Sequence, residues 1–499
     1  MTAKRPIAVV DTGSNSVRLL VVRRLTTGAF EVLDEEKFDA RLGQGQDSGN
    51  LTPAGIERGL RALRVVTQVA QSYQPSALIA VGTEALRRAP NRDQFLEAVF
   101  RETGVEVRVL TAAEEAQASF LGTVNSTSLR DGHIVDVGGG SLEFMRVERR
   151  HLVSAQSVPL GAIYATERFL HSDPPTGKEV RALRKAVRQQ LAVQGRLPVL
   201  VGVGGAARSL ARLHRSKSRY PLRRLHGMVI QRREFHRIAA MLVAMTAEQR
   251  RKISSINTAR ADIIHAAAIA IDEVMDLAGA GAIEVSGQGL REGLAWMELR
   301  PGQPVLPDVR AASIEGLARA NGVDAPGAAD VVAAAARLFD ATRALHSLGN
   351  DDREILLAAA RLKGAGMHID YYNRDRHAEY LVHSGALHGF THREVVLLAA
   401  LLRWAPDGVP DLSPYRAVLA PEDGRRATVL AALLGVAQAA HRRTPTPLRS
   451  FAPVLRDDGL QILLRGDGAL DAEVLALERQ QKRLETALGV TLQVHLLPA

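Results

Sequence analysis

The sequence predicts an α/β protein of two related lobes, followed by an all-helical domain and a small α+β tail. Two observations predict the lobes. The pattern D-x-G-x-x-S at 11–16 recurs at 136–141, and a strand-like apolar run stands before and after each copy. Strands on both sides indicate a hairpin turn, because a dinucleotide-binding glycine loop opens a helix instead. The third observation is an Ala/Leu-rich helical composition that begins after the Pro/Gly linker at 300–308.

The expected elements follow from hydrophobic periodicity. In the first lobe, 1–126, strands are expected at 6–11, 17–23, 30–38, 77–82 and 106–110, and helices at 53–72, 91–103 and 112–123. The second lobe, 127–300, begins with the strand before the second glycine loop and closes with a helix at 288–299. The helical domain covers 309–440, 442–453 forms a second break, and the tail, 454–499, reads strand, helix, strand.

Composition excludes several classes of protein. The chain has 499 residues, of which 46% are hydrophobic and 24% charged, as is typical of globular proteins. No apolar stretch approaches the roughly 20 residues that a membrane helix needs. The absence of cysteine excludes disulfides, thiol catalysis and cysteine-ligated zinc. We therefore expect a cytoplasmic protein with no membrane contact.

The glycine loops indicate a site for phosphate. Glycines allow positive φ and let backbone N–H groups approach an anion. A hairpin without a ligand explains one such loop equally well, but two loops in register, each led by an aspartate, favour a phosphate and metal site. A third loop, at 202–205, opens an Ala-rich helix whose N-terminus can receive phosphate. We expect the three loops to meet in a cleft between the lobes.

Two neighbouring acids open the helix expected at 112–123. Thr111 and Glu114 have the spacing of a capping box, which gives Glu114 a structural role. Glu115 has no such role and is the better candidate for chemistry, although an acid in a first turn more often only stabilises the helix dipole.

The second glycine loop brings further acids. Asp136 stands at its strand end, and Ser141 and Glu143 lie two apart on a strand and so share a face. Mg²⁺ prefers one or two carboxylates with waters and phosphate oxygens, which this set can supply. The position that matches Glu143 in the first copy is Arg18.

Positive charge is concentrated between residues 178 and 224. This segment has thirteen Lys or Arg residues and one acid, whereas the whole chain carries a net charge of +10. One helical face there holds Arg181, Arg184, Lys185 and Arg188. A solvated Arg-rich surface is the plainer interpretation, but clustering this strong favours a polyanion. A phosphate chain is favoured over nucleic acid, because aromatic residues make up only 4% and no nucleic-acid-binding module is visible.

Together the motifs resemble the exopolyphosphatase / guanosine pentaphosphate phosphohydrolase (Ppx/GppA) family, which has the fold of the sugar-kinase/actin/Hsp70 superfamily. The matching segments run in family order over about 1–300: "DTGSNSVRLLV", "GTEALRRAPN", "EEAQASFLG", "VDVGGGSLEF", "VPLGAIYATERF", "VGVGGAARSLARL" and "SGQGLREG". Two departures are Gln117, where an Arg is usual, and Ala206, where a Thr is usual. Neither is one of the implied base or metal ligands, but Ala206 puts one phosphate contact of the family in question.

The resemblance implies roles for individual residues. It implies that Glu115 is the catalytic base and that Asp136 and Glu143 serve Mg²⁺, for which Mn²⁺ could substitute. It also implies that phosphate is held by Asn15, Arg87, Gly138, Gly139, Gly140 and Ser141, and the glycine loops add Asp11, Ser14, Gly204 and Gly205 as expected phosphate-binding residues. Arg87 also suits phosphate because its guanidinium is a planar fork, although a surface arginine explains its spacing equally well.

The region 309–440 resembles the helical domain of HD-phosphohydrolase type found in this family. Lys363 and Gly364 stand where the His-Asp pair is expected, and the histidines that remain are His368, His377 and His383. We expect a His-rich amphipathic surface there rather than a metal site.

The resemblance and the motifs favour Mg²⁺-dependent hydrolysis of terminal phosphates from inorganic polyphosphate, with Arg181, Arg184, Lys185 and Arg188 as a track for the chain. Hydrolysis of guanosine pentaphosphate, phosphoryl transfer to another acceptor and non-catalytic polyphosphate binding stay open. Retention of Glu115, Asp136 and Glu143 argues against the last, because binding alone needs no base. A homodimer is one assembly compatible with the sequence.

Overall fold

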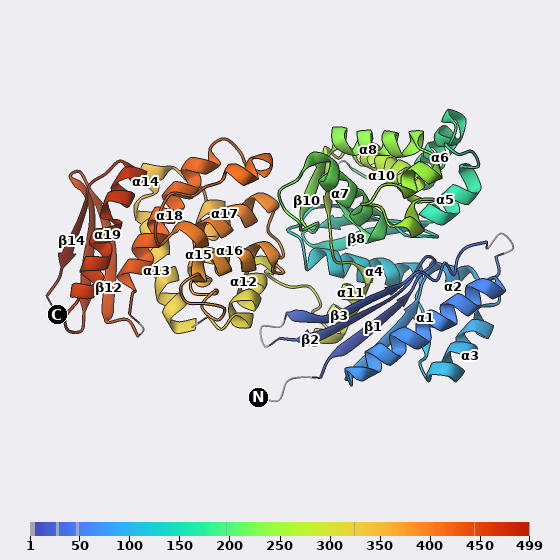
Figure 1. The fold of residues 1–499 in the computed structure, drawn as a ribbon, viewed down its shortest axis with the longest axis horizontal. Coiled ribbons are helices and arrows are strands. Elements are labelled where there is room, and N and C mark those ends of the chain that lie inside the picture. Colours follow the sequence, from blue (N-terminus) through green and yellow to red (C-terminus); the bar gives the residue numbers. More distant parts are fainter. Residues whose placement is uncertain are drawn as a thin grey trace. The chain divides into compact units, whose positions relative to one another are not determined.

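The computed structural model describes residues 5–25, 29–45, 49–195, 197–323, 325–443 and 445–498. The chain forms two compact units, Met1–Val309 and Arg310–Ala499. Figure 1 shows two layered α/β lobes in the first unit, and helices followed by a small sheet in the second.

The first lobe is built on a mixed five-stranded sheet with the order β3-β2-β1-β4-β5. Its strands are β1 (Ile7–Thr12), β2 (Val17–Arg24), β3 (Phe30–Phe38), β4 (Ala77–Gly82) and β5 (Val107–Val109). Strands β1, β2 and β3 form an antiparallel meander, whereas β4 and β5 run parallel to β1. Alternate residues of β1 face opposite sides, so Ala8 and Val10 pack under α1 (Pro53–Ser72) and α3 (Arg92–Thr103), while Ile7 and Val9 belong to a different core.

The second lobe has a six-stranded sheet with the order β10-β11-β9-β6-β7-β8. Its strands are β6 (Gly132–Val137), β7 (Leu142–Glu148), β8 (His151–Val158), β9 (Val199–Val203), β10 (Met228–Gln231) and β11 (Ala282–Val285). One face is covered by helices, as Figure 1 shows. The helices of this lobe are α5 (Ala162–Phe169), α6 (Gly177–Gln190), α7 (Gly204–Ser218), α8 (Arg232–Ala244), α9 (Ala247–Arg251) and α10 (Ile264–Ala278).

Both glycine loops are hairpin turns, as the sequence predicts. Loop 13–16 joins β1 to β2, and loop 138–141 joins β6 to β7. Each is closed by the same bond, from Gly13 N to the Ser16 carbonyl at 3.1 Å and from Gly138 N to the Ser141 carbonyl at 3.0 Å. The structure therefore supports the duplication inferred from the repeated motif.

Two helices each pack on the sheet of the lobe to which their place in the chain does not assign them. Helix α4 (Ala112–Val124) follows the first sheet in the chain, yet Phe120 and Val124 pack on the second sheet. Helix α11 (Leu290–Leu299) comes last, yet Leu294 and Leu299 pack on the first sheet with Ile7. The helix expected to close the second lobe thus completes the core of the first.

Glycines bring α4 and α11 into close contact. A Cβ on Gly122 would lie 2.0 Å from the Gly289 carbonyl oxygen, and one on Gly293 would lie 1.7 Å from the Ala118 carbonyl oxygen. Only glycine fits at either position without moving a backbone, so the crossing depends on both residues.

The second unit is helical up to residue 440 and then forms a sheet. Its helices are α12 (Val309–Ala320), α13 (Ala325–Ala341), α14 (Arg343–His346), α15 (Asn350–Arg361), α16 (Arg374–Ser384), α17 (His392–Trp404) and α18 (Asp423–Ala440). The tail consists of β12 (Leu448–Arg456), β13 (Gly459–Gly466), α19 (Asp471–Leu488) and β14 (Leu492–Leu496). Helices and sheet share one continuous core. The HD type of the helical region stays a prediction.

One expected element of the tail is wrong. Residues 448–456 form a strand, where the sequence indicates a break at 442–453. Pro447 and Pro453 suggested the break, but β12 lies at the edge of the sheet, where a proline costs no ladder hydrogen bond on the open side.

None of the described helices combines the length and the apolar character required to cross a membrane.

Candidate active site

The loops of the two lobes meet around a polar cavity of about 120 Å³. Its wall includes nearly all the residues predicted for catalysis, metal and phosphate: Asp11, Ser14, Asn15, Glu115, Asp136, Gly138, Gly139, Gly140, Ser141, Glu143, Gly204 and Gly205. The structure therefore brings together the residues that were expected from three separate loops and a helix start, and their roles stay predictions. Arg87 is outside the wall but contacts Glu115 directly.

Glycines let the loops approach one another. A Cβ on Gly139 would lie 2.9 Å from the Ser14 Cβ, and one on Gly140 would lie 2.8 Å from the Glu84 Cγ. Gly204 has a φ of +81°, and a Cβ there would lie 2.2 Å from an Asp136 carboxylate oxygen. These glycines thus close the cavity and leave backbone N–H groups accessible to an anion.

The two acids at the start of α4 have different environments. Thr111 and Glu114 form the predicted capping box, and Glu114 also pairs with Arg108. The Glu115 side chain is only 13% exposed and accepts a hydrogen bond from Arg87 Nη1 at 2.9 Å. Burial raises the pKa of Glu115 to about 7, with opposition from Arg87 and support from the nearby charges of Asp11 and Asp136. A carboxyl group with such a pKa suits a general base near neutral pH.

Besides Glu115, the wall of the cavity holds the carboxylates of Asp11, Glu84, Asp136, Glu143 and Glu292. Burial raises the pKa of Asp136 to about 6, and burial followed by repulsion from Glu115 and Asp136 raises that of Glu143 well above its usual value. Burial also raises the pKa of Asp11. Asp136 and Glu143 are direct register partners across the β6–β7 hairpin, and Glu143 accepts a 2.9 Å hydrogen bond from Ser157 Oγ.

These acids fit a hard divalent cation that has further ligands. A cation would offset the repulsion that raises their pKa values, and oxygen donors are the ligands that Mg²⁺ prefers. Among the described residues, no three Asp, Glu or His side chains are placed to hold a metal by themselves. Mg²⁺ on Asp136 and Glu143 would therefore need water and phosphate oxygens to complete its coordination.

Polar atoms in the cavity also lack partners. Both terminal atoms of Asn15 and one carboxylate oxygen of Asp11 are buried without a hydrogen bond to any described residue. Buried polar groups are nearly always bonded, so these atoms are free to bind a ligand.

Four arginines of the cavity wall were not among the predicted site residues: Arg18, Arg208, Arg260 and Arg291. Burial lowers the pKa of Arg18 and of Arg260 to about 10, with repulsion from neighbouring arginines. Arg208 donates to the Gly287 carbonyl at 2.8 Å, and Arg291 donates to the Leu19 carbonyl at 2.9 Å. So many guanidinium groups around a small cavity favour a multiply charged anion.

The four arginines differ in how clearly the sequence identifies them as site residues. Arg208 follows Gly204 by four residues on α7, one helical turn from the loop, and Arg291 lies in the segment "SGQGLREG". Arg18 was noticed only as the counterpart of Glu143. Arg260 stands in a short 3-10 helix, η1 (Thr258–Arg260), without any nearby motif, so only the folded chain identifies it.

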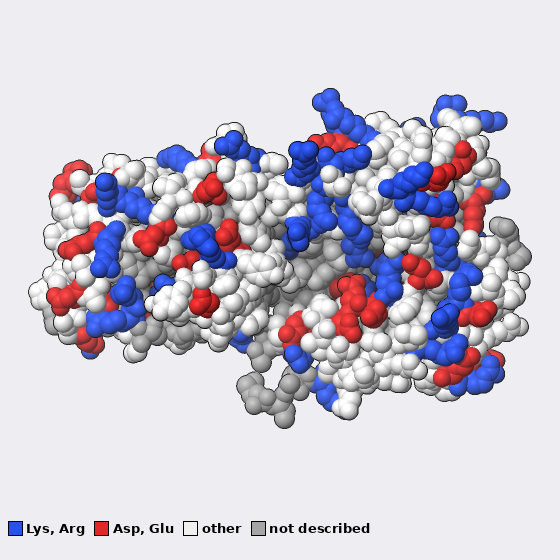
Figure 2. Space-filling model, in the orientation of Figure 1, with Lys and Arg blue, Asp and Glu red and all other residues white. Residues whose placement is uncertain are grey.

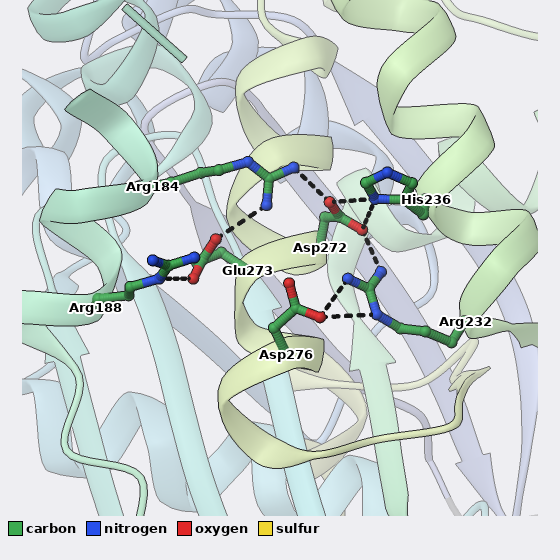
Figure 3. Close-up of polar contacts among 7 residues, drawn as sticks. All are labelled: Arg184, Arg188, Arg232, His236, Asp272, Glu273 and Asp276. Atoms are coloured by element: carbon green, nitrogen blue, oxygen red, sulfur yellow. Dashed lines mark hydrogen bonds and ion pairs between the residues drawn. The ribbon is translucent and has the colours of Figure 1, made fainter. Parts of the chain in front are cut away.

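The four residues proposed as a track lie on α6 and do not line the cavity. Arg184 donates to Glu273 at 2.9 Å and to Asp272 at 2.5 Å, and Arg188 also pairs with Glu273. Figure 3 shows these contacts, together with Arg232, His236 and Asp276 around the acids of α10. Asp272 and Glu273 are fully buried, so Arg184 and Arg188 serve as their counterions. Arg184 and Arg188 are therefore not unpaired cations, and the role of the four residues as a track for polyphosphate stays a prediction.

Two α/β lobes with related hairpin loops, a shared polar cavity and exchanged helices define a protein of actin-like fold. A family model for the Ppx/GppA phosphatase family matches residues 21–300, and one for Ppx/GppA phosphatase, domain III, matches residues 309–455. The chain belongs to the Ppx/GppA phosphatase family.

Similar proteins cover somewhat more than half of this chain. Exopolyphosphatase 2 of Mycobacterium tuberculosis is 31% identical over 310 residues, which cover 58% of this chain and 97% of that protein. The crystal structure of an exopolyphosphatase from Cytophaga hutchinsonii has 26% identity and a TM-score of 0.56, and covers 59% of this chain and 97% of that one. The Aquifex aeolicus member of the Ppx/GppA family has 29% identity and a TM-score of 0.53, with the same coverage.

Proposed function

We propose that this chain is an exopolyphosphatase, which hydrolyses the terminal phosphoanhydride bond of inorganic polyphosphate with the help of Mg²⁺. The observation that carries the proposal is the cavity itself. It joins a buried carboxylate whose pKa is near neutral, three phosphate-type loops and four arginines. The names of the similar proteins from Mycobacterium tuberculosis and Cytophaga hutchinsonii support the same activity.

In the proposed reaction the chain's own groups bind and orient the reactants. Backbone N–H groups of loop 138–141 and of the start of α7 would bind oxygens of the terminal phosphoryl group. Mg²⁺ on Asp136 and Glu143 would neutralise charge on those oxygens. Glu115 would accept a proton from the attacking water, whose oxygen bonds to phosphorus as the bond to the bridging oxygen breaks. Arg87 would hold the Glu115 carboxylate in place, and the arginines of the wall would stabilise the leaving phosphate.

The composition of the wall favours a phosphate chain over a guanosine nucleotide. The described residues that line the cavity include no Phe, Tyr, Trp or His. Recognition of a purine base usually relies on stacking against an aromatic ring or an Arg plane and on hydrogen bonds to the base edge. The arginines of the wall suit phosphate oxygens, and Arg291 among them is also paired with Glu35 and Glu292.

The test compares substrates side by side. Phosphate release is measured from long-chain polyphosphate, tripolyphosphate and guanosine pentaphosphate, with Glu115→Gln as the inactive control. The proposal expects kcat/KM to be highest on polyphosphate. A higher value on the nucleotide would assign the chain to guanosine pentaphosphate hydrolysis instead. Phosphoryl transfer to ADP without phosphate release would identify a phosphotransferase.

A further inference from the structure

A second polar pocket, of about 550 Å³, lies on the second lobe outside the reaction cavity. It is lined by Arg212, Arg215, Ser216, Ser254, Ser255 and Asn257. All six side chains can donate hydrogen bonds, and no acid is among them. This composition suits an anion.

Both walls of the pocket continue into the reaction cavity. One wall is α7, on which Arg208 of the cavity is followed by Arg212 and Arg215 at spacings of four and three residues. These spacings place the three arginines on one face, over a rise of about 10 Å at 1.5 Å per residue. The other wall, 254–257, leads directly into η1, whose Arg260 lines the cavity.

The charges of pocket and cavity are also coupled. Burial and repulsion from Arg215 lower the pKa of Arg212, and repulsion from Arg212 contributes to the lowered pKa of Arg260. Figure 2 shows basic side chains outnumbering acidic ones over the region where Figure 1 draws α7 and β10. Basic residues thus continue from Arg208 and Arg260 of the cavity wall into the pocket.

The pocket has hydrogen-bonding capacity that the protein does not use. Ser255 Oγ is buried without a partner in the described part of the chain. The Arg212 guanidinium has no ion pair or hydrogen bond to any described residue, and Arg215 donates only to the Arg223 carbonyl. This contrasts with Arg184, whose guanidinium is occupied by Asp272 and Glu273.

We propose that this pocket is a second anion subsite, where Arg212, Arg215 and Ser255 bind phosphate groups of a polyphosphate chain whose terminal phosphoryl group occupies the reaction cavity. The inference rests on the proposed exopolyphosphatase function and adds the direction in which the chain leaves the cavity, along α7. It replaces the face of α6 as the main track, because two of the four basic residues there already neutralise buried acids.

The test compares two chain lengths in matched variants. Arg212→Gln/Arg215→Gln removes two charges from the pocket, and Arg233→Gln/Arg237→Gln removes two exposed charges from α8 of the same lobe. KM is measured for long-chain polyphosphate, which offers phosphate groups for both the cavity and the pocket, and for tripolyphosphate, which has only three. The pocket variant should raise the long-chain KM at least about tenfold, the scale of losing charge-assisted hydrogen bonds. Its tripolyphosphate KM, and both values for the control, should stay within about twofold.

A second variant with a smaller change tests the pocket without disturbing the fold. Ser255→Ala removes a hydroxyl that has no hydrogen-bond partner among the described residues, so the fold should be unaffected. We expect a rise of about two- to fivefold in the long-chain KM alone, as for a single hydrogen bond. Unchanged long-chain KM values in both pocket variants, or equal losses on both chain lengths, would overturn the subsite.

Failure of the proposed function gives a different result. Wild-type protein that releases no phosphate from either polyphosphate would contradict the exopolyphosphatase activity. The subsite is then decided by equilibrium binding of long-chain polyphosphate to wild type and to Arg212→Gln/Arg215→Gln. Weaker binding by the variant supports the subsite, and equal binding overturns it.

Discussion

Glu114 and Glu115 are neighbours in the chain but differ in what surrounds them. Glu114 is 43% exposed in a capping box, whereas the Glu115 side chain is only 13% exposed and lies beside Arg87. Glu115→Gln should lower kcat by about 10²–10⁴, the usual contribution of a positioned general base. Glu114→Gln should leave kcat unchanged and cost about 1 kcal/mol or less of unfolding free energy. Steady-state kinetics and urea unfolding of both variants check this, and a larger kcat loss for Glu114→Gln would contradict our choice of base.

The raised pKa of Glu115 predicts a pH dependence. A general base must be deprotonated, so kcat/KM should rise with pH through about 7 and level off above it. Arg87 opposes the upward shift, so Arg87→Gln should move this acid limb to higher pH. The measurement is the pH profile of kcat/KM at saturating Mg²⁺ for both proteins. An acid limb that moves downward in the variant would exclude Glu115 as its source.

Asp136 and Glu143 predict a metal requirement. We expect activity to need Mg²⁺ or Mn²⁺ and to disappear in excess EDTA. Asp136→Asn and Glu143→Gln should each raise the metal concentration for half-maximal activity at least about tenfold, the loss seen even for outer-sphere partners. Glu148→Gln, on the same strand as Glu143 but outside the cavity, serves as the control. Titration of Mn²⁺ binding by calorimetry gives a readout that does not depend on turnover.

Among single site residues, the sequence predicts those that belong to a motif and misses those that do not. Asp136 and Gly204 stand in recognisable loops, and the structure brings them to within contact of each other. Arg260 belongs to no sequence motif. Its position in the cavity wall depends on how residues 254–257 and η1 pack against α7. Side chains that enter a site through tertiary packing leave no local pattern in the sequence.

Among the elements, α6 illustrates how a charge pattern can mislead. Its basic face suggested a free surface for a polyanion, but the partners of Arg184 lie on α10, almost 90 residues further along the chain. The composition of α6 shows only its own basic residues. It does not show that buried acids of α10 will pair with them.

This contact gives a prediction about stability. Arg184→Gln should lower the free energy of unfolding by about 3 kcal/mol, because it leaves charges of Asp272 and Glu273 buried with fewer counterions. Arg181→Gln, an exposed change on the same helix, should cost less than about 0.5 kcal/mol. Urea unfolding of both variants measures the difference, and equal stabilities would show that the network in Figure 3 does not hold α6 to α10.

For the molecule as a whole, the repeated motif correctly predicts two lobes but not the exchange of helices between them. The D-x-G-x-x-S pattern is local, whereas the packing of α4 on the second sheet and of α11 on the first is a tertiary choice. Hydrophobic periodicity shows that each helix has an apolar face and does not show which sheet covers it.

Substitution of a glycine where α4 and α11 cross tests how these two helices pack. Gly122→Ala places a Cβ 2.0 Å from the Gly289 carbonyl oxygen and should cost about 2 kcal/mol or more, as for overpacked cores. Gly281→Ala, where no atom lies within 4 Å of the added Cβ, should change stability by less than about 0.5 kcal/mol. Thermal unfolding of both variants checks the contrast. A loss no larger than that of Gly281→Ala would mean that the two helices are not in contact here.

The exchanged helices also affect the order in which the chain can fold during synthesis. Ile7, Val9, Leu20 and Val22 form one face of the first sheet, and Leu294, Ala295 and Leu299 of α11 help to cover it. Although domains generally fold as units from the N-terminus as the ribosome delivers them, this face stays incomplete until residue 299 has emerged. The first lobe is therefore the first to be translated but can be finished only together with the second, so a ribosome that stalls between them leaves an open apolar surface.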